Sequence, residues 1–372
     1  MTGEGHFTGR SAKRAVGATL ATRAVGATLA KRAVGATPRK LDLVIDESSA
    51  IEGFGRIQVS MVLTDPRVVD NPIVYVNAAF ERTTGYARSA VIGRNCRFLQ
   101  GEGTAKRDVD RIRAAIEHDR DVSVDILNYR ADGRPFLNRL IIAPIEDGEG
   151  GLLYYLGIQK ALGEDERGDA AADHLLAAIR ARVREDLSLV IAGIGQHAGD
   201  IPSFGAMTRR VGCLELVYQS LKLADVQGAR ARGIDLGALL SRVGAAIAHR
   251  ESRAGIRYQQ HVEPAVANLD ASVRVSLLVS EVLDNAFRHA FERLEEGVVE
   301  LRLTRLSGDG LRITIADDGV GLAPNAPFPN LETTGGRLVA TLTDGLDATI
   351  TPVRGAAGTV VMIDVPTGVT LP

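Results

Sequence analysis

The order of apolar and polar positions divides the chain into regions of different character. Residues 41–160 carry short alternating apolar runs that predict strands, and a helix is expected from Ala78. The turn signal Ala131-Asp132-Gly133-Arg134 joins two of the strands. This pattern predicts one α+β domain. Its strands are expected at residues 57–64, 73–76, 122–127, 135–145 and 152–159.

The middle of the chain has helical periodicity. Residues 161–173 are charged and rich in Gly and Ala, which predicts a linker or signalling helix. Within residues 174–232, Leu176, Val183 and Val190 belong to one apolar stripe, and a second stripe runs over 204–221. An isolated pair of such helices leaves apolar surface exposed. We therefore expect a dimerisation hairpin that forms a four-helix bundle with a second copy, and thus a homodimer.

The two ends of the chain differ from each other. Residues 1–40 hold three copies of Arg-Ala-Val-Gly-Ala-Thr, starting at Arg14, Arg23 and Arg32. Because these repeats can bury little apolar surface, we expect a flexible arm. Residues 233–372 alternate helices with strands, which predicts an α/β sandwich. Its strands are expected at residues 255–261, 298–306, 311–316, 348–353 and 359–365, with helices over 273–293 and from Gly336.

Charge and cysteine content exclude several classes of partner. The 44 basic residues balance the 46 acidic ones to a net charge of -2, so neither nucleic acid nor an anionic membrane is expected to bind. No secretory signal and no apolar run of transmembrane length is present, so we expect a cytoplasmic protein. Cys96 and Cys213 lie far apart and form no metal-ligand cluster.

One of these thiols lies among polar residues inside the 41–160 domain. A lone cysteine is most often a small buried hydrophobe. However, Gly93-Arg94-Asn95-Cys96-Arg97-Phe98-Leu99-Gln100, with the preceding Asn77-Ala78-Ala79-Phe80 and Thr84-Gly85-Tyr86, closely resembles the LOV (light, oxygen or voltage) family. The resemblance implies a PAS-type fold that binds flavin mononucleotide (FMN), with FAD as the alternative cofactor.

The resemblance extends over the whole domain and implies a role for each matching residue. Cys96 is the photoreactive thiol, which forms a reversible thioether with the flavin in blue light. Guanidinium groups suit the phosphate of the flavin, and amide side chains offer donors and acceptors to the ring edge. The implied flavin-contacting residues are Asn95, Arg97, Gln100, Arg113, Asn128, Asn138 and Gln159.

Gln159 on the last strand is, by the same resemblance, the signal relay. The flavin N5 atom changes from acceptor to donor in the adduct. The amide of Gln159 should then rotate, because a buried amide left unpaired costs about 1–3 kcal/mol. That rotation would bias the strand and the linker that follows it.

The C-terminal region carries two further motifs. Glu281, Asn285 and His289 are spaced by four and line one helix face. Downstream, Asp317-Asp318-Gly319-Val320-Gly321 follows a strand, and its glycines permit close backbone approach. In this order the motifs resemble the N box and G1 box of the GHKL ATPase superfamily (gyrase, Hsp90, histidine kinases, MutL). The resemblance implies ATP binding through Glu281, Asn285, His289, Asp317, Gly319 and Gly321, with Asn285 as a ligand of Mg²⁺.

The third nucleotide-binding element is altered. The family has a Gly-x-Gly at the start of a helix, whereas this chain reads Thr333-Thr334-Gly335-Gly336-Arg337 and keeps one of the two glycines, Gly335, in register. A helix N-terminus still offers N–H groups to phosphate. We therefore expect ATP to bind.

The first helix of the hairpin resembles that of a kinase subfamily that reads His-Arg-Val-Lys-Asn-Asn-Leu. Ala181 stands at the histidine position and has no nucleophile, so phosphorylation there is chemically impossible. The carboxylates of Glu185 and Asp186 replace two asparagines and are expected near an incoming phosphate. His174 lies seven residues before Ala181, and His197 lies on roughly the opposite face.

These observations leave more than one class of function for a multidomain α+β protein. The favoured class is a blue-light sensor with a degenerate kinase output, a pseudokinase that signals by conformation or by binding a partner such as a response regulator. The alternative is an active sensor histidine kinase that uses a non-standard acceptor or a histidine of a partner. An anti-sigma-factor-like Ser/Thr kinase shares the ATP fold but lacks the paired helices, which argues against it.

Overall fold

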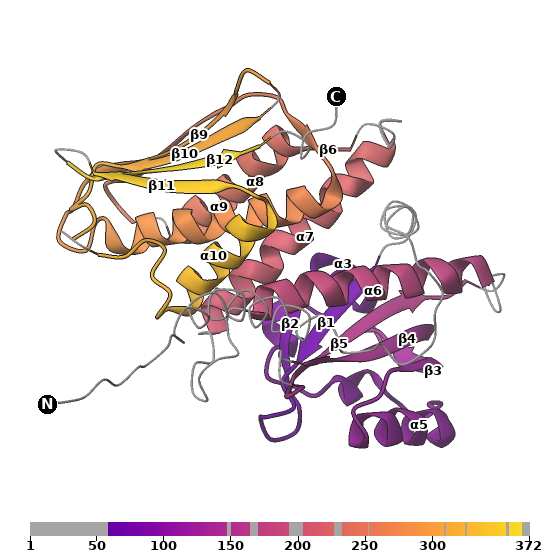
Figure 1. Cartoon of the computed structure of the whole chain (residues 1–372). Coiled ribbons are helices and arrows are strands. Elements are labelled where there is room, and N and C mark those ends of the chain that lie inside the picture. Colours follow the sequence, from indigo (N-terminus) through magenta and orange to yellow (C-terminus); the bar gives the residue numbers. More distant parts are fainter. Residues whose placement is uncertain are drawn as a thin grey trace, which may run out of the picture. The chain divides into compact units, whose positions relative to one another are not determined.

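A computed structural model of the chain shows the arrangement of its elements (Figure 1). The N-terminal repeats and His197 lie outside the described residues. None of the helices within the described ranges combines the length and apolarity that crossing a bilayer requires. The described residues are 59–146, 150–163, 170–192, 204–226, 233–251, 253–308, 310–323, 326–354 and 357–366.

The first domain is built on a five-stranded sheet in the order β2-β1-β5-β4-β3, with every neighbouring pair antiparallel. The expected strands are confirmed to within three residues at each end, and the helix at Ala78 begins where Asn77 caps it by accepting from the Phe80 N–H. The elements are β1 (Ser60–Thr64), β2 (Ile73–Val76), α3 (Ala78–Thr84), α4 (Arg88–Val91), η1 (Cys96–Leu99), α5 (Lys106–Glu117), β3 (Val122–Tyr129), β4 (Pro135–Glu146) and β5 (Leu152–Ala161).

Two long helices follow, α6 (Ala170–Ala192) and α7 (Phe204–Val226). Helix α6 begins inside the stretch 161–173, which was expected to be a linker or signalling helix. Its stripe residues Leu176, Val183 and Val190 are each at most 2% exposed within this one chain. The exposed apolar face from which a homodimer was inferred is therefore absent from the described part of α6, and the dimer stays a prediction without that support.

The last domain is the expected α/β sandwich. Its five-stranded sheet has the order β11-β12-β10-β9-β7, and β7 is parallel to β9. Helices α8, α9 and α10 lie along one face of this sheet (Figure 1). Helix α9 starts four residues earlier than expected, because the side chain of Asn268 caps it by accepting from the Ala271 N–H. The elements are β6 (Ile234–Asp235), α8 (Leu236–Glu251), β7 (Ile256–Val262), β8 (Val266–Ala267), α9 (Leu269–His289), β9 (Gly297–Arg305), β10 (Leu311–Asp317), α10 (Thr334–Gly345), β11 (Thr349–Arg354) and β12 (Thr359–Val365).

Candidate functional sites

A cavity of about 680 Å³ lies in the first domain between the sheet and the segment that carries Cys96. This volume lies in the range of cofactor and ligand sites. The wall is mostly apolar, which suits a flat aromatic ring system. The apolar lining residues include Val62, Leu99, Ile112, Ile126, Leu140 and Ile142.

Cys96 opens η1 and is held toward the cavity by its neighbour. The Asn95 side chain caps η1 by accepting from the Arg97 N–H at 2.9 Å, and its Nδ2 donates to the Asp70 carbonyl at 2.5 Å. The Asn95 amide therefore fixes the turn, and Asn95 also lines the cavity in which it was expected to orient the ring. Burial raises the pKa of the Cys96 thiol to about 12. The thiol is protonated at neutral pH and can serve as a proton donor.

Three amides expected to contact the flavin come together on adjacent strands. Asn128, Asn138 and Gln159 are 4%, 0% and 2% exposed, and Asn138 Nδ2 donates to Asn128 Oδ1 at 2.8 Å. Among the described residues, the buried Asn138 Oδ1 and Gln159 Oε1 atoms have no hydrogen-bond partner. Buried acceptors are rarely left unpaired in proteins, so these atoms fit a ligand that carries an N–H group on its edge, as a flavin ring does.

Arginines lie along the rim of the cavity. Arg97 and Arg113 line it with side chains 61% and 65% exposed, and they pair with Asp70 and Asp110. Exposed guanidinium groups at the mouth of an apolar cavity suit a phosphate that remains partly in solvent. Gln100 also lines the cavity. Arg67, bonded to Asp65 at 2.8 Å, lies on the same rim and was missed, because no motif position marks it.

A second cavity, of about 310 Å³, lies in the last domain. Four of the expected nucleotide residues line it: Asn285, His289, Asp317 and Gly321. The Oδ1 atom of Asp317 accepts from the backbone N–H groups of Gly319 and Thr359, each at 3.1 Å. The Oδ2 atom takes part in neither of these bonds. Burial raises the pKa of Asp317 above its ordinary value.

The phosphate end of this cavity is formed by the start of α10. Thr333 caps that helix by accepting from the Gly336 N–H at 3.0 Å, and both residues line the cavity. A Cβ atom at Gly336 would lie 1.8 Å from the Asn330 carbonyl oxygen, so the close approach requires glycine. A half-buried carboxylate at one side and a helix N-terminus at another fit the adenine and phosphates of a nucleotide.

Comparison with known proteins agrees with both cavities. Residues 58–160 match the PAS domain model, and residues 270–366 match the model of the histidine kinase-, DNA gyrase B- and HSP90-like ATPase. The chain is 41% identical to the Blue-light-activated histidine kinase 2 of Erythrobacter litoralis (strain HTCC2594), over 85% of this chain and 93% of that protein. It belongs to the blue-light-activated histidine kinases.

Two further comparisons support the assignment of the chain to this family. Blue-light-activated histidine kinase 1 of the same Erythrobacter strain is 30% identical over 72% of this chain and 75% of that protein. The solved structure of the Erythrobacter litoralis EL346 blue-light activated histidine kinase superposes with a TM-score of 0.64 at 39% identity, over 85% of this chain and 97% of that one. The multidomain α+β fold expected from the sequence is confirmed.

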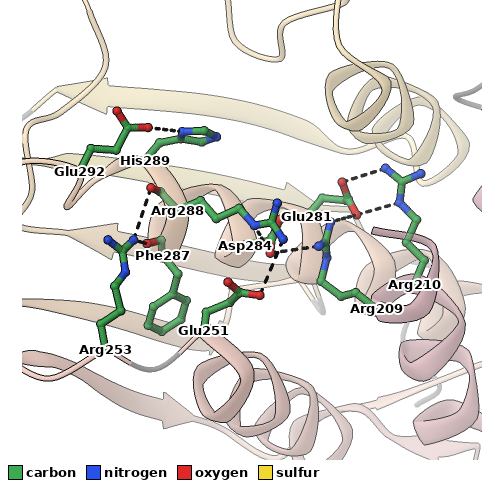
Figure 2. Close-up of polar contacts among 10 residues, drawn as sticks. All are labelled: Arg209, Arg210, Glu251, Arg253, Glu281, Asp284, Phe287, Arg288, His289 and Glu292. Atoms are coloured by element: carbon green, nitrogen blue, oxygen red, sulfur yellow. Dashed lines mark hydrogen bonds and ion pairs between the residues drawn. The ribbon is translucent and has the colours of Figure 1, made fainter. Parts of the chain in front are cut away.

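Three nucleotide residues expected in this family member lie outside the lining of the second cavity. Glu281 turns instead toward Arg209 and Arg210 of α7 (Figure 2). Gly335 lies beside it, since a Cβ at Gly335 would be 3.0 Å from Glu281 Oε2. A Cβ at Gly319 would lie 2.1 Å from the Ala290 carbonyl oxygen, so this glycine allows the G1 segment to pack against α9.

The acceptor position of this family member is solvent-exposed. Ala181 is exposed on α6, and the Glu185 side chain is 66% exposed. Asp186, in contrast, is fully buried: Arg182 Nη2 lies 2.8 Å from its Oδ1, and the Tyr218 hydroxyl donates to its Oδ2 at 2.6 Å. The expectation that both carboxylates face an incoming phosphate is therefore wrong for Asp186, because this carboxylate is taken up in an internal network.

Proposed function

We propose that this chain is a blue-light sensor in which Cys96 forms a reversible flavin-cysteinyl adduct that controls a histidine-kinase-like module. The observation that carries the proposal is the first cavity, which is lined by the protonated Cys96 thiol and by Gln159, whose buried Oε1 has no partner among the described residues. Bound flavin supplies the light absorption and the reactive ring carbon. The chain supplies the thiol and the shape of the cavity.

The flavin is FMN in this proposal. Arg97 and Arg113 at the rim would hold its phosphate, while Gln100, Asn128, Asn138 and Gln159 would hold the ring edge. Extraction of the cofactor and its identification by chromatography against FMN and FAD standards test the choice. FAD as the main cofactor would require the rim to admit an adenylate, and it would remove the proposed role of the two arginines.

The C-terminal module binds ATP with Mg²⁺ in this proposal. Asp317 would accept from the adenine amino group, and Asn285 would be the Mg²⁺ ligand, because both line the second cavity with His289. Asn285 offers an amide oxygen, the kind of ligand that Mg²⁺ prefers. Calorimetric titration of ATP with and without Mg²⁺ measures this directly, and equal affinity in the two titrations would remove the metal from the proposal.

The output of the module is conformational in the proposal, a degenerate kinase that acts on a partner such as a response regulator. The exposed alanine at position 181 supports this, since no nucleophile is offered there. The second candidate is an active kinase. His174, half-buried on the same helix, or a histidine of a partner would then be the acceptor.

Incubation with γ-labelled ATP in darkness and in blue light separates these candidates. The proposal expects no acid-labile label on the wild-type chain in either condition. Label that appears on the wild type and disappears in His174→Ala would establish the active kinase instead. Analytical ultracentrifugation of the same samples tests the predicted homodimer.

A further inference from the structure

Two consecutive arginines of α7 are buried against the helix that carries the N box. Arg209 is 4% exposed and Arg210 is 1% exposed. A guanidinium group keeps its charge at any physiological pH, so its burial requires carboxylate partners. Glu281 and Asp284 of α9 provide them (Figure 2). We name these four residues the α7 clamp.

Within the α7 clamp, the guanidinium group of Arg210 binds the Glu281 carboxylate in a bidentate pair. Arg210 Nε donates to Glu281 Oε1 at 2.9 Å and Nη2 donates to Oε2 at 3.0 Å. Arg209 donates to Glu281 Oε1 at 3.3 Å and lies 3.0 Å from Asp284 Oδ1. A bidentate pair of this kind fixes direction as well as distance. The Glu281 side chain is thereby held toward α7.

The clamp also reaches a third helix. Arg210 Nη1 donates to the carbonyl oxygen of Val190 in α6 at 3.3 Å. Asp284 has a second cation, since Arg288 Nε lies 3.1 Å from its Oδ1. Glu281, in contrast, forms its ion pairs within the described residues with Arg209 and Arg210 of α7. Its charge balance therefore depends on α7.

Glu281 lies next to the predicted phosphate end of the nucleotide site. It precedes Asn285 by one turn of α9, and its Oε2 would be 3.0 Å from a Cβ at Gly335, in the first turn of α10. Burial alone would raise the pKa of Glu281, but the Arg210 and Arg209 guanidinium groups hold it below its ordinary value. An anionic carboxylate at this place would repel phosphates unless a cation neutralised it.

We propose that Arg210, supported by Arg209, is a positioning residue of the nucleotide site. It neutralises the Glu281 carboxylate and holds it beside Gly335, so that the net charge of the α7 clamp sets the affinity for nucleotide phosphates. The inference rests on the proposed nucleotide site. In this proposal α7 acts directly on the nucleotide site, because any movement that separates α7 from α9 leaves an unpaired carboxylate beside the phosphates.

Four forms of the full-length protein test this: wild type, Arg210→Met, Glu281→Gln and the double variant. Calorimetry gives each one's affinity for Mg-ATP and for adenosine, which has no phosphate. Arg210→Met should lower the ratio of Mg-ATP to adenosine affinity by about tenfold, and Glu281→Gln should raise it, because the remaining charges have opposite signs. The double variant should return the ratio to the wild-type value.

Arg182→Met is the matched control. Arg182 is another buried arginine, 8% exposed and bound to a carboxylate of its own helix, and within the described residues it forms no hydrogen bond or ion pair with Glu281. A loss of stability without a change in the affinity ratio is expected there. A similar fall of the ratio in Arg182→Met would show that general destabilisation explains the effect, and it would overturn the proposal.

Other outcomes of the same experiment also test the proposed role of the α7 clamp. A ratio that is the same in all four forms, or a double variant that stays as weak as Arg210→Met, overturns the role of charge. If Arg210→Met does not fold, an unchanged or lower ratio in Glu281→Gln overturns it equally. If the wild type binds neither ligand, the proposed nucleotide site itself fails, which is a different result from a failed clamp.

Discussion

Loss of the buried Gln159 amide should destabilise the protein with bound flavin and have a smaller effect without it. Gln159 is 2% exposed and lines the first cavity, and its Oε1 has no hydrogen-bond partner among the described residues. A flavin ring edge would pair with this amide, and a hydrogen bond of this kind contributes about 1 kcal/mol. Gln159→Leu removes the amide at similar volume. The flavin-loaded variant should therefore lose about 1 kcal/mol, which lowers Tm by about 4–8 °C for a domain of about 100 residues.

In the flavin-free protein, water in the cavity can pair with the amide instead, so Gln159→Leu should change Tm by less than about 4 °C. Thermal unfolding of loaded and flavin-free forms, followed by circular dichroism, measures both changes. Gln100→Leu is the control, because Gln100 lines the same cavity but is only half-buried, so its replacement should lower the Tm of the loaded form by less.

The same variant tests the relay. Leucine cannot answer a change of hydrogen-bond polarity at the ring. Gln159→Leu should still form the adduct, but the difference in hydrogen exchange between light and dark across residues 161–176 should largely disappear. A flavin-loaded Gln159→Leu protein that unfolds at the wild-type temperature would refute the stability reasoning. Wild-type exchange differences in the variant would refute the relay.

Three further predictions concern the thiol, the nucleotide site and the acceptor position. Burial raises the pKa of Cys96 to about 12; the thiol therefore stays protonated, and adduct yield under blue light should be constant between about pH 6 and pH 9, where an ordinary thiol begins to ionise. Asn285→Ala should weaken Mg-ATP binding about tenfold or more in calorimetry without lowering Tm by more than about 3 °C, since the residue lines the cavity and is only half-buried. Ala181→His should accept little acid-labile label from ATP, and Ala181→His with Glu185→Asn should accept more, whereas adding Asp186→Asn should reduce stability because that carboxylate is buried against Arg182.

Most of the fold could be predicted because local signals and burial agree. Alternation of apolar residues marks the strands of both sheets, and caps such as Asn77 mark helix starts. Helix α5 was not anticipated, since its exposed, charged sequence has a narrow apolar stripe. The α6 stripe finds partners inside the chain, which a helical pattern alone cannot show, so the predicted homodimer has to be tested on other grounds.

The two candidate sites, like the fold, could be predicted only in part. Motif residues such as Asn128, Asn285 and Asp317, which were predicted to contact a ligand, line the two cavities. Long-range pairs could not be read from the sequence. Arg210 and Glu281 lie on different helices, and no local pattern links them, so the turn of Glu281 away from the nucleotide cavity emerged only from the tertiary structure.

The central claim is that Cys96 reacts with a flavin in the first cavity and that the last domain responds. Absorbance of purified wild type and Cys96→Ala under blue light, followed by dark recovery, tests this most directly, with Mg-ATP affinity measured in both states. We predict that the wild type bleaches and recovers with a matching change in Mg-ATP affinity, and that Cys96→Ala keeps its flavin and shows neither change. A Cys96→Ala protein that still bleaches with recovery like the wild type would contradict the account.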